Sequence, residues 1–285
     1  MKNKVWFITG ASKGFGFEIA RAALASGDQV VATVRKNAGE LTARLNGGDR
    51  ALVVTLDVIS EKEVQAGVDA AIDRFQRIDV LVNNAGYGLL AATEEASAEE
   101  VRKQYDTNVF GLLNVTRAVL PQLRKQASGH IINTSSLFAY LNNVPGFGLY
   151  GSTKYAVEGI SEGLATELSP LGIHVTAVAP GLFTTDFVST DSYQPSTLVL
   201  DAYKATVGAI RANMGSFNGN QPGDPVKLAA VIVKLAASEN PPLHLPIGRD
   251  AVKNLREKTA QITREMEEWE ALSTSTDHQR TPAGK

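Results

Sequence analysis

The stretch Thr9-Gly10-Ala11-Ser12-Lys13-Gly14-Phe15-Gly16 decides the fold, because of what stands on either side of it. The apolar run Lys4–Thr9 predicts a buried strand, and a helical pattern over Phe17–Ser26 follows the glycines directly. Glycines permit a tight turn and let phosphate oxygens approach amide groups at a helix N-terminus, where the dipole favours an anion. The spacing of the glycines alone would also fit an ordinary glycine-rich turn. Between the first strand and first helix of an α/β sheet, it predicts a dinucleotide site.

Outward from this turn, short apolar runs alternate with helical patterns. Five further runs predict strands: Gln29–Val34, Leu52–Asp57, Val80–Asn83, His130–Thr134 and Val175–Ala179. Their interiors are almost continuously apolar, which is typical of parallel strands covered on both faces. Helix starts are indicated by the capping-box spacings Ser60-x-x-Glu63 and Ser97-x-x-Glu100 and by Asp224-Pro225. The alternation predicts one α/β domain, a doubly wound parallel sheet with helices on both faces.

The domain organisation follows from where these patterns stop. Residues 1–248 predict one catalytic domain that includes a substrate loop at about 182–223, where turn-forming residues are frequent. Residues 249–272 carry apolar side chains at helical spacing and predict an amphipathic helix docked on the domain. Residues 273–285 are polar and contain proline and glycine, so we expect a disordered tail.

Composition excludes several classes of site. The 285 residues include no cysteine, so disulfides, cysteine nucleophiles and thiolate metal sites are excluded, and the four scattered histidines indicate no metal site. A net charge of −2 gives no long-range attraction to nucleic acid or to an anionic membrane. The N-terminal apolar run is too short for a signal peptide or a membrane span. We therefore expect a cytoplasmic protein that binds neither nucleic acid nor membranes.

Charge at the end of the second strand predicts which dinucleotide binds. A site for NAD usually carries Asp or Glu there, roughly 20 residues after the glycines, to bind the ribose 2′-hydroxyl. This chain has Val34-Arg35-Lys36 instead. A carboxylate would repel a 2′-phosphate, whereas the planar guanidinium of Arg35 can bind it, and Lys13 adds a second positive charge. The alternative is a solvated charge at a strand end. We favour NADP(H).

A tyrosine–lysine pair supplies candidate chemistry. Among seven tyrosines, only Tyr150 has a lysine four residues later, Lys154, and on a helix that spacing places both side chains on one face. An ammonium near a phenol lowers the pKa of the phenol from about 10. Such a tyrosine can exchange a proton with an alcohol or carbonyl oxygen. Taken alone, the pair is equally a helix residue with an exposed lysine.

Several motifs in one order identify a family resemblance. After the glycine turn come Asn83-Asn84-Ala85-Gly86, Asn108, Ser135-Ser136, Tyr150-x-x-x-Lys154 and Pro180-Gly181. With them, the chain resembles the short-chain dehydrogenase/reductase family over about Lys2–Gly248. The resemblance implies a Rossmann-type fold and hydride transfer between nicotinamide and a carbonyl or alcohol carbon. It also implies a homodimer or homotetramer formed through the helices that carry Asn108 and Tyr150.

The resemblance also implies catalytic roles. Tyr150 is the expected general acid or base. Lys154 is expected to lower the pKa of Tyr150 and to bind the nicotinamide ribose, and Asn108 is expected to position a water. A serine holds the substrate oxygen. Ser135 has the family's usual separation from Tyr150, but Ser136 better fits the Ser-x-x-small pattern. We favour Ser136, with Ser135 structural.

Cofactor contacts are expected from several segments of the chain. In the glycine turn we expect Gly10, Ser12, Lys13, Gly14, Phe15 and Gly16. Beyond it, with Arg35, Tyr150 and Lys154, the resemblance implies Asp57, Val58, Asn83, Ala85, Gly86, Pro180, Gly181, Phe183 and Thr185.

The substrate is indicated only by class. The segments expected around it contain many aromatic and few basic residues, which favours an apolar carbonyl compound or secondary alcohol. The alternative function is a dinucleotide-binding regulator or redox sensor without catalysis on the same fold. Because both Tyr150 and Lys154 are present, the sequence favours an NADP(H)-dependent oxidoreductase.

Overall fold

A seven-stranded parallel sheet forms the centre of the molecule. The computed structural model describes residues 3–141, 143–184, 193–217 and 221–278. The strands are β1 (Val5–Ile8), β2 (Gln29–Val34), β3 (Ala51–Thr55), β4 (Val80–Asn83), β6 (Gly129–Thr134), β7 (Ile173–Pro180) and β9 (His244–Ile247). Their spatial order is β3-β2-β1-β4-β6-β7-β9, and every pairing is parallel. The predicted doubly wound sheet is therefore confirmed.

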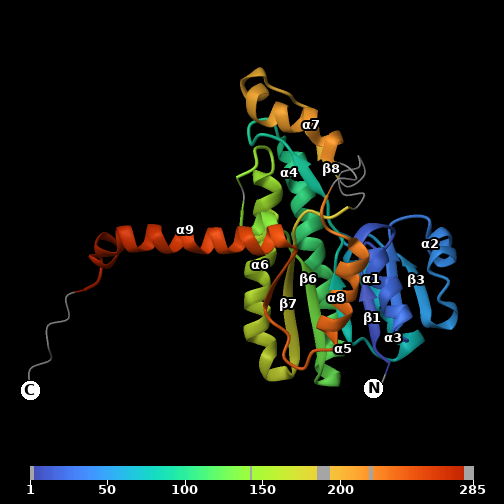
Figure 1. Cartoon of the computed structure of the whole chain (residues 1–285). Coiled ribbons are helices and arrows are strands. Elements are labelled where there is room, and N and C mark those ends of the chain that lie inside the picture. Colours follow the sequence, from blue (N-terminus) through green and yellow to red (C-terminus); the bar gives the residue numbers. More distant parts are fainter. Residues whose placement is uncertain (1–2, 142, 185–192, 218–220, 279–285) are drawn as a thin grey trace, which may run out of the picture.

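Helices cover both faces of this sheet (Figure 1). One face carries α1 (Gly14–Ala25), α2 (Ala38–Leu45) and α8 (Pro225–Ala236), and the other carries α3 (Glu61–Phe75), α5 (Gly111–Gln126) and α6 (Gly148–Leu168). Strand β1 contributes side chains to the hydrophobic cores on both faces of the sheet. Trp6 and Ile8 pack on one side, and Val5 and Phe7 pack on the other. Alternate side chains of a strand point to opposite faces, so a strand covered on both sides must be apolar throughout.

The predicted helix starts have the expected hydrogen bonds. Ser97 accepts from the Glu100 amide at 3.2 Å while the Glu100 carboxylate accepts from the Ser97 amide at 2.8 Å. Ser60 accepts from the Glu63 amide, but the Glu63 carboxylate bonds the Asp57 amide at 2.8 Å instead of closing the box. Asp224 caps α8 through the Val226 amide. These caps satisfy donors that a helix leaves unpaired at its start.

Above the carboxyl ends of the strands, smaller elements build a second layer. Strands β5 (Gly88–Leu90) and β8 (Tyr193–Pro195) pair in parallel, and α4 (Ala98–Tyr105) lies beside them. α4 passes through a π-helical turn, Asp106–Phe110, into α5. Within the predicted substrate loop stands α7 (Ala209–Phe217), at the top of Figure 1. The short helical turns are Gly48–Arg50, Leu137–Ala139, Ser169–Leu171, Asp201–Tyr203 and the π-helical Lys204–Gly208.

The C-terminal helix leaves the domain after its first turns. α9 (Arg249–Thr274) begins on the domain, where Ala251 is buried against β9 and the turn Leu137–Ala139, and then projects away from it (Figure 1). Ile262, Met266 and Trp269 are 51%, 61% and 58% exposed. The expected docking on the domain is therefore seen only at the first turns of the helix. Its apolar spacing does not specify which surface covers it. The helix also extends to Thr274, and residues 279–285 of the expected tail lie outside the described residues.

Candidate active site

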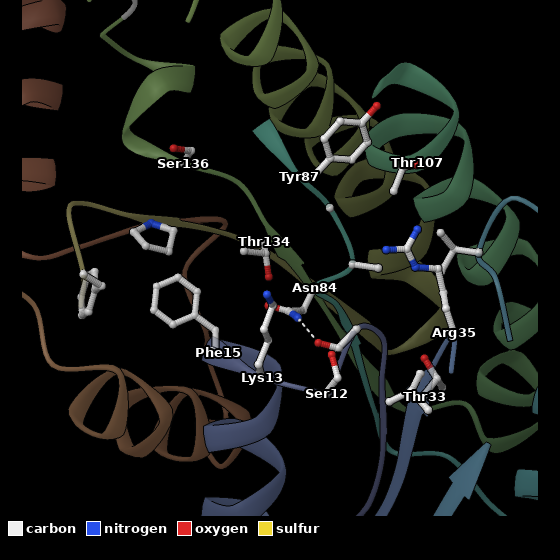
Figure 2. A pocket seen from close by; sticks show the side chains of 18 of the residues that line it. Ser12, Lys13, Phe15, Thr33, Arg35, Asn84, Tyr87, Thr107, Thr134 and Ser136 are labelled. Carbon is white, nitrogen blue, oxygen red and sulfur yellow. Dashed lines mark hydrogen bonds between the residues drawn. The ribbon is translucent and has the colours of Figure 1, made fainter. Parts of the chain in front are cut away.

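A cleft of about 1210 Å³ lies at the carboxyl ends of the strands (Figure 2). It opens above β1 and β4, where the chain order of the sheet reverses, and open α/β sheets bind ligands at such a point. Residues from the glycine turn, from the end of β2, from α6 and from the loop after β7 line it. The cleft therefore brings together most of the side chains that the sequence singled out.

The glycine turn forms the floor of one end of the cleft. Gly10 has φ +64°, and a Cβ there would lie 3.0 Å from the Cα of Ala85. A Cβ on Gly16 would lie 2.5 Å from the Gly10 carbonyl oxygen, so Gly16 packs the turn rather than lining the cleft. The N-cap of α1, Lys13, makes no side-chain capping bond, and the first turn contains no acidic residue. The amides at the start of α1 are therefore suited to bind an anion.

The neighbouring residues Asn83 and Asn84 have different surroundings. Asn84 lines the cleft and donates to the carbonyl oxygens of Thr9 and Gly10, both at 3.0 Å. Asn83, the predicted cofactor contact, is buried beneath the cleft and donates to Thr116 and Asn133. The side chain of Asn83 therefore does not line the cleft, and the predicted cofactor contact at Asn83 stays a prediction. Successive side chains at a strand end point in opposite directions, which places Asn84 rather than Asn83 against the turn.

Four cations line the cleft near the glycine turn, among them Lys36 beside Arg35. Lys13 stands within the turn, Arg35 follows β2, and Arg44 on α2 donates to the Ser12 carbonyl oxygen at 2.8 Å. Figure 2 shows the Arg35 guanidinium extending toward Tyr87, and its charge opposes the burial that raises the pKa of Tyr87 to about 12. Arg35 makes no hydrogen bond or ion pair with any residue that the structure describes. Sequence reasoning missed Arg44 because it lies on a helix outside any motif.

At the other end of the cleft, Ser136 and Tyr150 meet. Ser136 follows β6 and caps the turn Leu137–Ala139, accepting from the Phe138 amide at 3.3 Å. Its hydroxyl also bonds the phenol of Tyr150, which lies in the first turn of α6. The hydroxyl of Ser135 is buried and has no hydrogen-bond partner among the described residues, while its amide donates to Val178. Of the two serines, only Ser136 therefore touches the tyrosine.

Lys154 lies one helical turn after Tyr150 and is almost fully buried. Its ammonium donates to the Thr134 carbonyl oxygen at 2.7 Å and stands 5.8 Å from the centre of the Tyr150 ring. Burial lowers the pKa of Lys154 from 10.5 to about 8, and the Glu158 carboxylate opposes that shift. Glu158 is itself buried and bonds His244 at 2.9 Å. The pKa of this lysine therefore lies well below that of an exposed lysine.

The phenol of Tyr150 behaves differently from the sequence expectation. Burial raises its pKa to about 12, and the hydrogen bond from Ser136 only partly offsets this. We expected Lys154 to lower the pKa, but the ammonium is turned toward Thr134, and desolvation penalises the phenolate more strongly. Tyr150 therefore holds its proton at neutral pH.

Asn108 lies behind the end of the cleft that holds Tyr150, not on its wall. It stands in the π-helical turn, where it donates to the Tyr87 carbonyl oxygen at 2.9 Å and to Thr153 at 3.1 Å and accepts from the Tyr87 amide. A Cβ on Gly86 would lie 3.0 Å from its amide oxygen. Single π-turns within helices are frequent at functional sites. Here the turn fixes Asn108 against the Gly86 backbone.

The remaining expected contacts surround the cleft. Asp57, Val58, Ala85, Gly86, Pro180, Gly181 and Phe183 line it, whereas Thr185 lies outside the described residues. Phe183 packs edge-on against Phe15, with ring centres 5.3 Å apart. The first turn of α9 closes this side, because Asp250 accepts from the Leu182 amide at 2.6 Å and contacts Gly181. The contact between Asp250 and the Pro180–Phe183 loop carries no signal in the sequence.

Aromatic side chains gather beside Tyr150. Phe138 stacks on Phe147 at 4.8 Å, both rings meet Tyr150 edge-on, and Tyr193 from β8 packs against Phe147. They form one buried apolar cluster with side chains from the predicted substrate loop. This end of the cleft therefore adjoins an apolar wall.

Comparison with known proteins identifies the family. A family model described as short chain dehydrogenase matches residues 4–195. The chain belongs to the short-chain dehydrogenase/reductase family. It is 39% identical to oxidoreductase BOA17 of Botryotinia fuckeliana over 95% of this chain and 98% of the relative. It is also 39% identical to a 3-ketodihydrosphingosine reductase of Bacteroides thetaiotaomicron over 87% of this chain and 89% of the relative. It is therefore an oxidoreductase of this family.

Solved structures agree with this assignment. A short-chain dehydrogenase from Streptomyces avermitilis superposes with a TM-score of 0.89 at 40% identity, over 97% of this chain and 100% of that one. A family member from Burkholderia phymatum in complex with NAD gives 0.80 at 25% identity over 93% and 95% of the two chains. ElxO with NADP bound gives 0.72 at 29% over 88% and 100%. Structural relatives therefore bind NAD or NADP in this fold.

The residues of this chain fit such a dinucleotide. Gly10 and Gly16 keep the turn open where any side chain would collide with backbone, and the amides at the start of α1 can receive a diphosphate. The cations near the turn can take further phosphate charge, while Lys154 lies at the far end. No helix among the described residues is long and apolar enough to cross a membrane.

Proposed function

We propose that the chain is an NADP(H)-dependent oxidoreductase that interconverts an apolar carbonyl compound and its alcohol, as an oligomer of identical chains. The observation that carries this proposal is the placement of Ser136, Tyr150 and Lys154 together at one end of a cleft whose other end is a glycine turn with cations. That arrangement pairs a proton donor with a nucleotide site.

When bound in the cleft, NADPH would supply the hydride for reduction of the carbonyl carbon. As the C=O π electrons move to oxygen, the Ser136 hydroxyl donates a hydrogen bond to that oxygen and stabilises the developing charge. The phenol of Tyr150 then transfers its proton to the oxygen and completes the alcohol. A pKa of about 12 for Tyr150 keeps this proton in place until negative charge develops. Oxidation of the alcohol reverses each transfer.

NADP(H) is preferred to NAD(H) in this proposal because of Arg35. Its guanidinium reaches into the cleft without a carboxylate partner among the described residues, so it is available for a 2′-phosphate. Arg44 and Lys13 add positive charge nearby. A ribose 2′-hydroxyl offers no charge to match this set.

An apolar substrate is supported by the aromatic cluster beside Tyr150. The stacked pair Phe138–Phe147 and the Tyr193 ring present apolar surface next to the proton donor. A relative named as a 3-ketodihydrosphingosine reductase is by that name a ketone reductase. We propose a ketone as the reacting group here as well.

A paired-variant assay tests the function. The purified chain is mixed with NADPH or NADH and a panel of aliphatic and aromatic ketones, and loss of reduced-cofactor absorbance is followed. Tyr150→Phe is expected to lower kcat at least ~100-fold, the typical contribution of a general acid, while NADPH binding by fluorescence is retained. Tyr155→Phe, exposed on the same helix, is the control and is expected to keep full activity. Retention of more than a few per cent of activity by Tyr150→Phe contradicts the proposal.

A further inference from the structure

The projecting helix α9 carries a regular apolar seam. Apolar or small side chains recur at alternating spacings of three and four residues along it: Val252, Leu255, Thr259, Ile262, Met266, Trp269 and Ser273. This is the heptad pattern by which α-helices pack against one another. From Ile262 onward the seam is more than half exposed, with Trp269 at 58%. A large indole in solvent on a regular seam indicates a partner helix.

The charges on α9 are distributed unevenly along its length. Residues 249–264 contain five basic and two acidic residues: Arg249, Lys253, Arg256, Lys258, Arg264, Asp250 and Glu257. Residues 265–274 contain four glutamates and no basic residue. A parallel pair of such helices would place like charges side by side. An antiparallel pair places the basic half of each helix along the acidic half of the other.

We propose that α9 is an oligomerisation helix that pairs with α9 of a second copy as an antiparallel coiled coil. In such a pair, the first seam residue of each heptad packs against the second seam residue of a heptad in the partner. Val252 therefore lies opposite the partner's Trp269, and Leu255 lies opposite the partner's Met266. Around the two-fold axis, Thr259 lies opposite the partner's Ile262. The same surface of both copies forms the contact, which closes as a dimer.

Charge selects this register over its neighbours. At the positions that flank the seam, Lys258 comes opposite the partner's Glu265 and Arg249 opposite the partner's Glu270. A shift of one heptad in one direction sets Glu265 against the partner's Glu265. The opposite shift sets Lys258 against the partner's Lys258, so only the central register is complementary.

The absence of cysteine from the sequence makes a direct test possible. The double variant Leu255→Cys/Met266→Cys is oxidised and separated on a non-reducing gel. Within one helix the two sites lie roughly 16 Å apart, too far for a disulfide, which needs Cα atoms about 4.4–6.8 Å apart. Between antiparallel helices in the proposed register they are neighbours, so a covalent dimer is expected. Each single cysteine variant is the control and is expected to stay monomeric on the gel.

A charge exchange tests the same register without cysteine. Lys258→Glu and Glu265→Lys each place like charges opposite one another, and each is expected to weaken α9-dependent association at least tenfold in sedimentation velocity. The double variant Lys258→Glu/Glu265→Lys restores opposite charges and is expected to recover association. Retained NADPH binding and helical circular dichroism identify variants that have kept their fold.

Each outcome decides the proposal. A cross-linked double cysteine variant together with recovery by charge exchange supports it. Cross-linking of Leu255→Cys alone indicates parallel helices and overturns the register. No cross-linking in the double cysteine variant, or a sedimentation coefficient that Trp269→Lys leaves unchanged, overturns the pairing. Association through other surfaces of the domain does not affect the cross-linking result, because the cross-link forms only between α9 helices.

Discussion

Replacing Glu158 by glutamine tests which charge keeps Lys154 protonated inside the cleft. Lys154 is almost fully buried, and burial lowers the pKa of its ammonium to about 8 even though the Glu158 carboxylate raises it. Glu158 lies four residues further along α6, so the two side chains share a helix face. His244 and Tyr140 also face the carboxylate. Glutamine keeps the shape and hydrogen-bonding capacity of this side chain but removes the charge.

The expected effect is an alkaline loss of activity that begins at lower pH. Without the carboxylate, the pKa of Lys154 falls below its value of about 8. Each unit of decrease corresponds to about 1.4 kcal/mol of lost attraction. For a fall of one unit, the charged fraction at pH 7.5 drops from about three quarters to about one quarter. Activity that depends on the ammonium should therefore fall about threefold at pH 7.5 and change little at pH 6.

The assay is the pH profile of kcat/KM for NADPH, which reports groups of the free enzyme. Glu162→Gln is the matched control, because Glu162 lies one turn further on α6 with its side chain 60% exposed and contacts the same His244 at 3.6 Å. It should leave the profile unchanged. A Glu158→Gln profile that coincides with wild type, or an equal shift in Glu162→Gln, would refute the reasoning. Melting temperatures check that both variants remain folded.

Three further predictions concern the cofactor, the serines and the core. Arg35→Asp should raise KM for NADPH ~30-fold or more, given about 2 kcal/mol for a charge-assisted hydrogen bond. KM for NADH should rise far less. Equal changes in the two KM values would exclude binding of a 2′-phosphate by Arg35. Ser136→Ala should lower kcat at least ~10-fold through loss of a donor to the oxyanion, whereas Ser135→Ala should leave kcat unchanged. The reverse result would show that Ser135, and not Ser136, binds the substrate oxygen. Burial lowers the pKa of His130 to about 3. The unfolded chain therefore binds more protons below about pH 6.5, and stability falls as pH drops. His130→Gln should reduce this loss in the free energy of unfolding by about 2 kcal/mol at pH 5, measured by urea unfolding. If the free energies of unfolding of wild type and variant change with pH in parallel, the prediction is contradicted.

Much of the sheet could be predicted because its strands are buried on both faces. Val5–Ile8 packs into both cores, so its uninterrupted apolar run indicates a parallel strand. The last strand, β9, carries an exposed histidine and a proline at the sheet edge and has no such pattern. Strands β5 and β8 have three residues each and depend on one another across about a hundred residues. Pairing at that separation leaves no local periodicity to read.

The site was predictable where it depends on glycines and a helical spacing. Tyr150 and Lys154 share a face because they are four residues apart, whatever the surroundings. Their pKa values could not be derived in this way, since burial and the orientation of the ammonium toward Thr134 set them. Likewise, Asn83 and Asn84 are chemically identical, and only the direction of the strand end separates a buried amide from one that holds the turn.

The π-helical turn at Asp106–Phe110 amounts to one residue more than an α-helix would use. Each residue of an α-helix turns the chain by about 100°. Deleting Thr107 would therefore let α4 run straight into α5 and swing the side chain of Asn108 away from Gly86 and Tyr87. A single surplus residue thus keeps two helices out of phase, so that one amide faces the interior. The length of this segment, more than its composition, is what the catalytic end of the cleft requires.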